Sequence, residues 1–202
     1  MLVLSREEMQ KADQEMIELG VPGLVLMEHA AIQLKNHVKP GALILCGSGN
    51  NGGDGLALAR LMELKGENPR VLIQSKRELV GDPLTNLKAA KNLGVKIDFF
   101  YDDLSLLKEA LSKASMVVDC LFGTGLTREI KSPYYESIRL LNESGLYILS
   151  TDLPSGLDAN TGETLGIAVK ADKTISFHAL KKGMLGYPNV EVVDIGIKGF
   201  ED

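Results

Sequence analysis

The chain has 202 residues, of which 45% are hydrophobic and 24% charged, and its net charge is −5. This length fits one domain with a sizeable core, and the acidic balance with only 5% aromatic residues argues against a nucleic-acid surface. No apolar run reaches membrane-spanning length, and the N-terminus lacks the order of a signal peptide. We therefore expect a cytoplasmic protein that binds neither nucleic acid nor a membrane.

Two helices are predicted at the start of the chain. Ser5 is followed three residues later by Glu8, and this capping box predicts a helix over 5–19. A second helix should span about 23–38, where apolar residues recur at helical spacing before Pro-Gly. Because both helices precede the first strand, they are an addition to an α/β core that either covers a sheet face or forms a subunit interface.

The stretch 42–60, ALILCGSGNNGGDGLALAR, organises the rest of the chain. Its first five residues are apolar, as in a strand buried on both faces, and its last five are good helix formers. Between them, GSGNNGGDG holds five glycines in nine residues. A glycine-rich turn from a strand into a helix aims backbone N–H groups and the positive end of the helix dipole at one point. The sequence therefore predicts an anion-binding loop, most often one for phosphate.

Beyond this loop, short apolar runs alternate with helical segments. This alternation indicates right-handed βαβ units and a mostly parallel sheet with helices on both faces. We predict a single domain over residues 1–202 with a three-layer α/β/α Rossmann-like fold, in which the last strands join the sheet edge by loops. The predicted strands span 70–74, 96–101, 115–122, 146–151, 173–177 and 190–195, and the predicted helices span 84–93, 104–113 and 135–142.

Three strands of the predicted sheet end in polar, glycine-rich loops. Besides the first loop, these are 119–128 and 151–162, and each includes a carboxylate at a strand end, Asp119 and Asp152 respectively. A parallel sheet brings such loops to one edge, where open α/β sheets bind their ligands. We therefore expect the three loops to form one site.

Neither a dehydrogenase-type dinucleotide site nor a P-loop fits the sequence well. The run 47–52 matches G-x-G-x-x-G, which many Rossmann-like folds share. An NAD-dependent dehydrogenase would also place an acidic residue at the end of the second strand, but that strand ends in Gln-Ser-Lys-Arg, where Lys76 or Arg77 could accept a 2′-phosphate. No Gly-Lys-Ser/Thr tripeptide indicates a P-loop. An ordinary dehydrogenase is therefore disfavoured.

The histidines and cysteines give no sign of a metal centre. His29, His37 and His178 have no metal-ligand spacing with one another or with the cysteines. Cys46 and Cys120 each end an apolar run, so we expect buried thiols in neighbouring strands.

Four segments together resemble one family: GNNGGDGLALAR, VVDCLFGTGLTREI, STDLPSGLDANTGE and the closing VVDIGI. They are similar to the NAD(P)H-hydrate epimerases, the YjeF N-terminal domain family, over essentially the whole chain. The resemblance implies an isomerase that interconverts the R and S forms of NADHX or NADPHX in nicotinamide-nucleotide repair. The family occurs alone or fused to a dehydratase, so the chain is either a stand-alone epimerase or a piece of a bifunctional protein.

The resemblance also implies site residues. Asn51, Asp119 and Ser155 would hold one potassium ion per subunit, and oxygen donors from three loops suit such a hard cation. Asp152 is the candidate catalytic residue, because epimerising a carbinolamine-like carbon needs a group that gives and takes a proton near the hydroxyl. The implied substrate-binding residues are Asn50, Asn51, Gly52, Gly53, Asp54, Gly123, Thr124, Gly125, Leu126, Thr127, Arg128, Glu129 and Asp152.

The implied partners are the small-molecule substrate, a second copy of the chain in a homodimer through the leading helices, and an ATP- or ADP-dependent NAD(P)H-hydrate dehydratase that uses the S form. A second hypothesis is a non-catalytic module of the same fold that binds a nucleotide and docks a partner. A third is a nucleotide-dependent transferase or oxidoreductase. The presence of Asn51, Asp119, Asp152 and Ser155 together favours an enzyme, because a binding module would not need all four.

Overall fold

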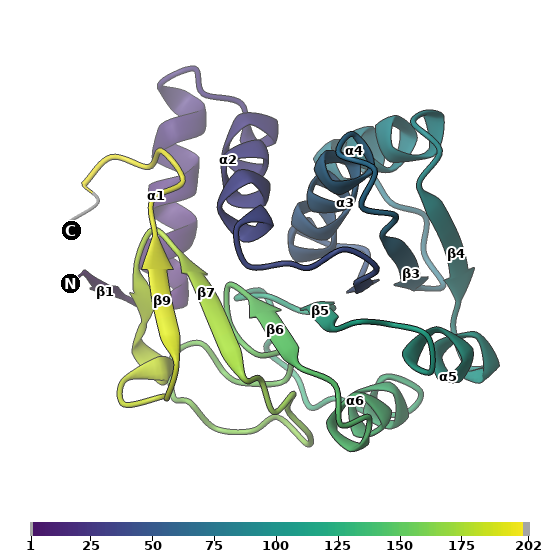
Figure 1. Cartoon of the computed structure of the whole chain (residues 1–202). Helices are drawn as coiled ribbons and strands as arrows, with labels where there is room; N and C mark the ends of the chain where they lie inside the picture. The colour runs from purple at the N-terminus through teal and green to yellow at the C-terminus, as the bar shows by residue number, and fades with distance from the viewer. Residues whose placement is uncertain (1, 200–202) are drawn as a thin grey trace.

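A parallel sheet forms the centre of the computed structural model, which describes residues 2–199 (Figure 1). Its strands are β2 (Leu43–Cys46), β3 (Arg70–Gln74), β4 (Lys96–Phe100), β5 (Val117–Cys120), β6 (Ile148–Thr151), β7 (Lys173–Phe177) and β9 (Val190–Val193). Their order is β4-β3-β2-β5-β6-β7-β9, and all neighbours pair in parallel. The predicted α/β fold is confirmed. Residue 1 and residues 200–202 of the predicted domain lie outside the described part.

Helices cover both faces of this sheet. They are α1 (Arg6–Glu18), α2 (Gly23–Lys35), α3 (Asn50–Glu63), α4 (Gly81–Asn92), α5 (Ser105–Leu111) and α6 (Tyr134–Glu143). Figure 1 shows α5 and α6 on one side and the other helices on the opposite side. Within β2, Leu43 and Leu45 pack into the core under α5 and α6, whereas Ile44 packs into the core under α2 and α3. The strand is therefore apolar throughout, as predicted for a central parallel strand.

The remaining elements are short. β1 (Val3–Leu4) pairs in parallel with β8 (Leu180–Lys181), and the 3₁₀ helix η1 is Lys182–Met184. Two-residue strands carry too little pattern to be predicted from sequence. As expected, β7 and β9 are joined without an α-helix. Within residues 2–199, no single helix is long and apolar enough to cross a membrane. Only α1 and α2 taken together have the length and composition of a membrane span, and the chain bends by 119° between them.

The capping box predicted for α1 is present. The Ser5 hydroxyl accepts the backbone N–H of Glu8 at 3.2 Å, and the Glu8 carboxylate accepts the backbone N–H of Ser5 at 2.7 Å. These two bonds satisfy N–H groups that the first helical turn leaves without partners, which explains why α1 begins where the sequence predicts.

The glycine-rich loop is shorter than predicted. α3 begins at Asn50 rather than near Leu56, with Gly49 as its N-cap, so the segment NNGGDG forms the first turns of the helix. Glycine is a poor helix former, and the sequence reasoning therefore assigned this segment to a loop. Packing against neighbouring chain segments overrides that propensity.

Glycines in this segment are required by close approach of the backbone, not by a positive φ. A Cβ on Gly52 would lie 2.0 Å from the carbonyl oxygen of Gly47, and a Cβ on Gly47 would lie 2.1 Å from that of Leu121. Neither contact can be relieved by a side-chain rotation, because both involve backbone atoms. The start of α3 is therefore held directly against the ends of β2 and β5.

Gly55 lets the backbone of α3 approach two cysteine side chains of the sheet closely. An added Cβ would lie 2.8 Å from the Sγ atoms of both Cys46 and Cys120, which are free, buried thiols at paired positions of β2 and β5. The prediction of buried thiols in neighbouring strands is thus confirmed.

We expect Gly55→Ala to lower the free energy of unfolding by about 1–3 kcal/mol, because overpacking at a well-packed position costs that much. Urea denaturation of the two proteins measures the difference. Gly125→Ala is the control, since an added Cβ there meets nothing within 4 Å. Equal stability of the two variants would contradict this account of the packing.

Candidate active site

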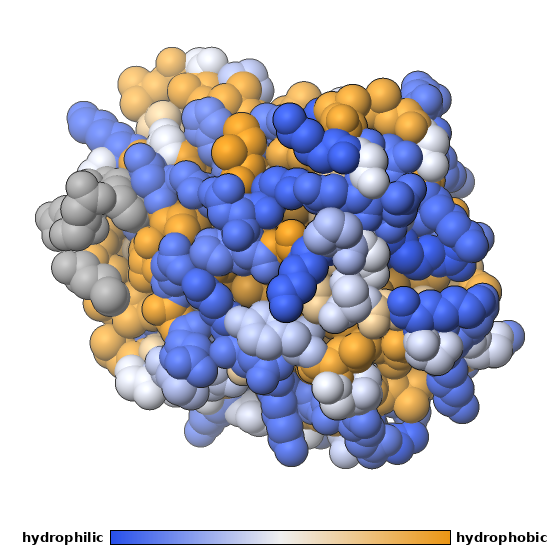
Figure 2. Space-filling model, in the orientation of Figure 1, coloured by the Kyte–Doolittle hydropathy of each residue, from blue (hydrophilic) through white to orange (hydrophobic). Residues whose placement is uncertain are grey.

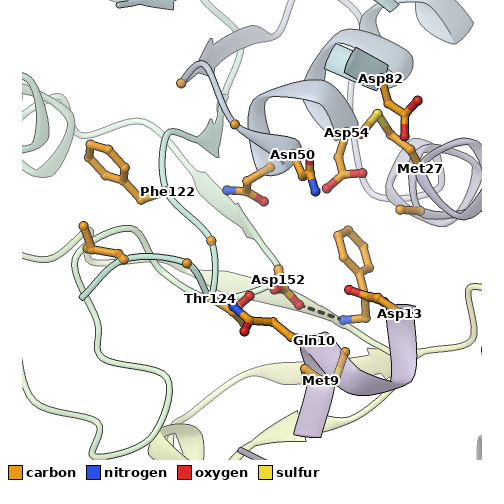
Figure 3. Close-up of a pocket in the computed structure, with 18 of the residues that line it drawn as sticks. Met9, Gln10, Asp13, Met27, Asn50, Asp54, Asp82, Phe122, Thr124 and Asp152 are labelled. Atoms are coloured by element: carbon orange, nitrogen blue, oxygen red, sulfur yellow. Dashed lines mark hydrogen bonds between the residues drawn. The ribbon is translucent and has the colours of Figure 1, made fainter. Parts of the chain in front are cut away.

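The candidate site lies where the strand order changes direction. From β2 the sheet continues through β3 to β4, and from β5 it continues through β6 and β7 to β9. Ligands of open α/β sheets bind outside the carboxyl ends of the strands at such a point. A pocket of about 720 Å³ opens there, and residues of the glycine-rich segment, of the loop after β5 and of α1 line it (Figure 3).

Asp119 is fully buried behind this pocket and is the acceptor for four hydrogen bonds. Its Oδ1 accepts the Ser155 hydroxyl at 2.6 Å and the Leu121 N–H at 3.3 Å. Its Oδ2 accepts the Ser150 hydroxyl at 2.8 Å and the Ser155 N–H at 2.9 Å. Burial raises the pKa of Asp119, and these hydrogen bonds oppose the rise.

Asn51 and Ser155 connect this cluster to the start of α3 and to the loop after β5. The Thr151 hydroxyl lies 2.7 Å from Asn51 Oδ1 and 3.0 Å from the carbonyl oxygen of Asp119. The Ser155 hydroxyl accepts the backbone N–H of Phe122 at 2.9 Å. The structure therefore brings Asn51 of α3, Asp119 of β5 and Ser155 of the turn after β6 into one hydrogen-bonded group.

The donor set of this group suits a hard monovalent cation. Carboxylate, hydroxyl and amide oxygens are the ligand types that such ions take. The buried Nδ2 of Asn51 has no hydrogen-bond partner within the described chain, and turning the amide over would place an oxygen at that position. No cluster of three His, Cys, Asp or Glu side chains within residues 2–199 could hold a metal ion. A cation bound here would therefore have one carboxylate ligand, and its other ligands would be neutral oxygens.

The predicted substrate-binding residues divide into two groups. Those that line the pocket are Asn50, Asn51, Asp54, Gly123, Thr124, Gly125, Leu126, Thr127, Arg128 and Asp152. Gly52, Gly53 and Glu129 do not line it. Gly52 is held against Gly47, and an added Cβ on Gly53 would lie 2.7 Å from the Met27 side chain, so both glycines serve packing of α3.

Arg6, at the start of α1, holds the loop after β5 in place. Its Nε donates to the carbonyl oxygen of Thr124 at 2.6 Å, and its Nη2 donates to that of Leu126 at 3.0 Å. The same Nη2 pairs with the Asp158 carboxylate at 2.8 Å, and the Arg6 side chain is only 12% exposed. Sequence reasoning missed this residue, because an arginine in a first helical turn has the pattern of an ordinary surface charge.

Asp152 directly follows β6, has a φ of +67° and forms an ion pair with Lys181. A positive φ is sparsely populated by residues other than glycine, and the Asp152 N–H holds it here by donating to the carbonyl oxygen of Ile175 at 2.7 Å. The Asp152 side chain is 14% exposed, and it reaches the pocket.

Lys181 is completely buried and was not predicted as a site residue. Its ammonium donates to the carbonyl oxygen of Phe177 at 2.9 Å and to the Ser176 hydroxyl at 3.1 Å. A buried ammonium needs a counter-ion, and Asp152 supplies it. In the sequence, Lys181-Lys182 looks like an ordinary surface pair, so only the tertiary structure reveals this partner.

Two further carboxylates face Asp152 across the pocket, Asp13 from α1 and Asp54 from α3 (Figure 3). Burial and the charge of Asp152 raise the pKa of Asp13 to about 6. Burial and the charges of Asp152 and Asp13 raise the pKa of Asp54 well above its usual range, and Lys181 opposes this. Three carboxylates thus share the field of one ammonium, which is the arrangement expected where protons are exchanged.

Asp13 is also absent from the sequence-based set of site residues. It lies one helical turn after Met9 and one turn before Ile17, and all three line the pocket. An acidic residue within an apolar helix stripe is a signal that could have identified it.

The chain is similar to known proteins over most of its length. Residues 23–183 match the family described as "YjeF-related protein N-terminus". The chain is 36% identical over 195 residues to an NAD(P)H-hydrate epimerase of Limosilactobacillus reuteri, covering 90% of this chain and 87% of that protein. It is 35% identical over 201 residues to a bifunctional NAD(P)H-hydrate repair enzyme Nnr of Thermofilum pendens, covering 95% of this chain and 38% of that protein.

Among solved structures, the crystal structure of a yeast protein matches with a TM-score of 0.84 at 22% identity. The match covers 96% of this chain and 88% of the yeast chain, and it shows that the two share a fold.

We expect Arg6→Met to loosen the loop after β5. The Leu126 N–H, which donates to the carbonyl oxygen of Gly123 at 3.2 Å, should exchange with solvent at least tenfold faster. Loss of one hydrogen bond from a charged donor costs roughly 1.5–3 kcal/mol, and about 1.4 kcal/mol is already a factor of ten. Hydrogen exchange followed by NMR measures this. Lys11→Met, an exposed cation on the same helix, is the control, and equal exchange in both variants would refute the proposed restraint.

Proposed function

We infer that this chain, which belongs to the family of YjeF-related protein N-termini, is an NAD(P)H-hydrate epimerase. The single observation that carries this conclusion is the 36% identity to an NAD(P)H-hydrate epimerase, in a match that covers 87% of that protein. The family and the isomerase activity predicted from four sequence motifs are thereby confirmed. The reaction interconverts the R and S forms of hydrated NADH or NADPH.

We propose that the dinucleotide hydrate lies in the pocket with its phosphates near the start of α3. Two features support this placement: the unpaired N–H groups and positive dipole end of a helix N-terminus attract phosphate, and Asn50 and Asn51 begin α3 at the pocket wall. Arg128, from the loop after β5, adds a positively charged residue to the pocket lining. The hydrated ring then lies near the carboxylates of Asp13, Asp54 and Asp152.

The chemistry at the ring can follow either of two routes. The hydroxyl can leave as water while the ring nitrogen forms a C=N bond, after which water adds to the other face, or the ring can open and reclose. Both routes need a group beside the hydroxyl that gives and takes a proton, and a carboxylate can do so. We propose Asp152 as that catalytic residue, and its support is its place in the pocket wall and its fixed orientation beside Lys181.

For the metal, we propose a potassium ion, one per subunit, held by Asn51, Asp119 and Ser155. The shared hydrogen-bonded group and the unpartnered Asn51 amide position support this choice. When bound, the ion supplies positive charge that neutralises Asp119 and orders the three loops around the pocket. These loops contain several glycines, whose ordering costs conformational entropy.

We also propose a cytoplasmic homodimer joined through the leading helices, and a separate ATP- or ADP-dependent dehydratase as functional partner. Exposed apolar side chains on α1 and α2 support the dimer: Ile17, Leu19, Val25 and Ile32. Figure 2 shows apolar atoms gathered at the top of the molecule, over the turn between α1 and α2. The bifunctional relative from Thermofilum pendens supports a dehydratase partner.

A non-catalytic nucleotide-binding module of the same fold is the alternative. Such a module needs the phosphate-binding end of α3 but not three carboxylates grouped around a buried lysine. The grouped carboxylates therefore favour the enzyme.

The direct test starts from the pure R form of NADHX and follows the R-to-S ratio by chromatography. We expect the wild-type protein to bring the epimers to equilibrium and Asp152→Asn to slow this exchange at least 100-fold, since loss of a positioned acid or base typically costs ~10²–10⁴. Dinucleotide binding, measured by calorimetry, should persist in the variant.

Asp102→Asn, an exposed acid in the turn after β4, is the matched control for this variant. Circular dichroism must show that Asp152→Asn folds, because the substitution leaves the Lys181 ammonium without its counter-ion. Binding without exchange by the wild-type protein would instead establish the non-catalytic module.

The potassium site predicts a cation-specific gain in thermal stability. At a potassium concentration ten times the dissociation constant, the gain is about 1.4 kcal/mol, or roughly 3–6 °C in melting temperature. Melting curves in potassium chloride and in choline chloride at equal ionic strength measure it. Ser155→Ala should remove the difference and Ser112→Ala, on the surface, should keep it. Identical melting of the wild-type protein in both salts would remove potassium from the site.

A further inference from the structure

α1 places an acidic side chain on the pocket wall that no assigned role explains. Met9, Gln10 and Asp13 of this helix line the pocket, and Figure 3 shows Asp13 and Asp152 directed toward the same space from α1 and from the end of β6. The two carboxylates thus come from different walls of one cavity.

The Asp13 carboxylate has no hydrogen bond or ion pair to any residue in the part of the chain that is described. The charged groups that face it are Asp152 just after β6, Lys181 of β8 and Asp54 of α3. Lys181 is already bound to Asp152 and to backbone carbonyl oxygens. The Asp13 carboxylate is therefore available to a ligand in the pocket.

Epimerisation by loss and return of water needs proton transfer on both faces of the ring. The departing hydroxyl must receive a proton on one face, and the incoming water must lose one on the other face. One carboxylate on one wall reaches only one face at hydrogen-bond distance. A second acid–base group on another wall removes this restriction.

We propose that Asp13 is a second catalytic residue, which works with Asp152 from the opposite face of the hydrated ring. This rests on the proposed epimerase function. In one direction the Asp13 carboxyl gives its proton to the hydroxyl oxygen, the C–O bond breaks, and the lone pair of the ring nitrogen forms the C=N bond. Water then adds to the other face, the C=N electrons return to nitrogen, and the surplus proton passes to Asp152.

The reverse reaction uses the same two carboxylates with their roles exchanged. Exchange with solvent returns the proton to the starting carboxylate, so each turnover leaves the enzyme and the composition of the substrate unchanged. The environment of Asp13 supports the role, because burial and the charge of Asp152 raise its pKa to about 6, which brings it closer to neutral pH than an ordinary aspartate.

This pair has a definite pH dependence. The active form carries one proton on the two carboxylates, and that proton is lost as the pH rises through the raised pKa of Asp13, about 6. The exchange rate of the wild-type enzyme should therefore fall about tenfold per pH unit above that value. In Asp13→Asn the residual rate should show no such decline.

The decisive variant is Asp13→Asn, assayed by R-to-S exchange of NADHX. We expect kcat to fall at least 100-fold, with KM changed by less than about twofold, because the substitution removes a proton donor and leaves the pocket shape. Glu15→Gln, which removes a charge from the exposed side of the same helix, should leave kcat and KM unchanged. Unfolding curves of both variants check that the helix is retained.

Three outcomes overturn the proposal. Unchanged kcat in Asp13→Asn overturns the role of Asp13 while the epimerase function stands. A lower kcat accompanied by a large rise in KM and a lower melting temperature assigns Asp13 a structural role only. Absence of exchange by the wild-type protein overturns the proposed function and the catalytic role together.

A measurement on the wild-type protein covers the case in which Asp13→Asn does not fold. Carbon-13 NMR of the side-chain carboxyl groups should show Asp13 titrating near pH 6, and this titration should move to lower pH in Asp152→Asn. Titration of Asp13 near its ordinary value, unaffected by Asp152→Asn, would overturn the pair.

Discussion

The buried carboxylate of Asp119 is the interaction on which the rest of the site depends. An ionised group without water is costly unless hydrogen bonds satisfy it, and four donors do so here. Two of those donors belong to Ser155, which also accepts the N–H of Phe122. The turn after β6 and the loop after β5 are therefore held together beside the pocket.

The second constraint is the ion pair between Asp152 and the buried ammonium of Lys181. It fixes Asp152 in a backbone conformation with positive φ at the pocket, and it sets the electrostatic field in which Asp13 and Asp54 lie. Because the single ammonium is paired with Asp152, the pKa values of Asp13 and Asp54 are raised and their protonated forms are favoured. A pocket of this kind suits a reaction in which protons pass to a leaving hydroxyl and from an incoming water.

The N-terminal helices are part of the site rather than an external cover. α1 contributes Asp13 to the pocket, and its first residue, Arg6, holds two carbonyl oxygens of the loop after β5. β1, just before α1, pairs with β8, which carries Lys181. The segment that precedes the first strand of the large sheet therefore positions both the loop after β5 and the strand that carries the buried Lys181 ammonium.

The sequence by itself determined the parallel α/β fold, the bounds of β3 and β7, the capping box of α1 and the three loops at one sheet edge, because local patterns of burial, capping and turns encode them. It also carried the family resemblance that identifies the activity. Tertiary structure alone decided that α3 begins at Asn50 and that Asp13 and Lys181 belong to the pocket. The physical reason is that these features arise from contacts between residues far apart in the chain. Packing at the start of α3 overrides the low helix propensity of glycine, and burial brings charged side chains that look like surface residues in the sequence into contact with one another.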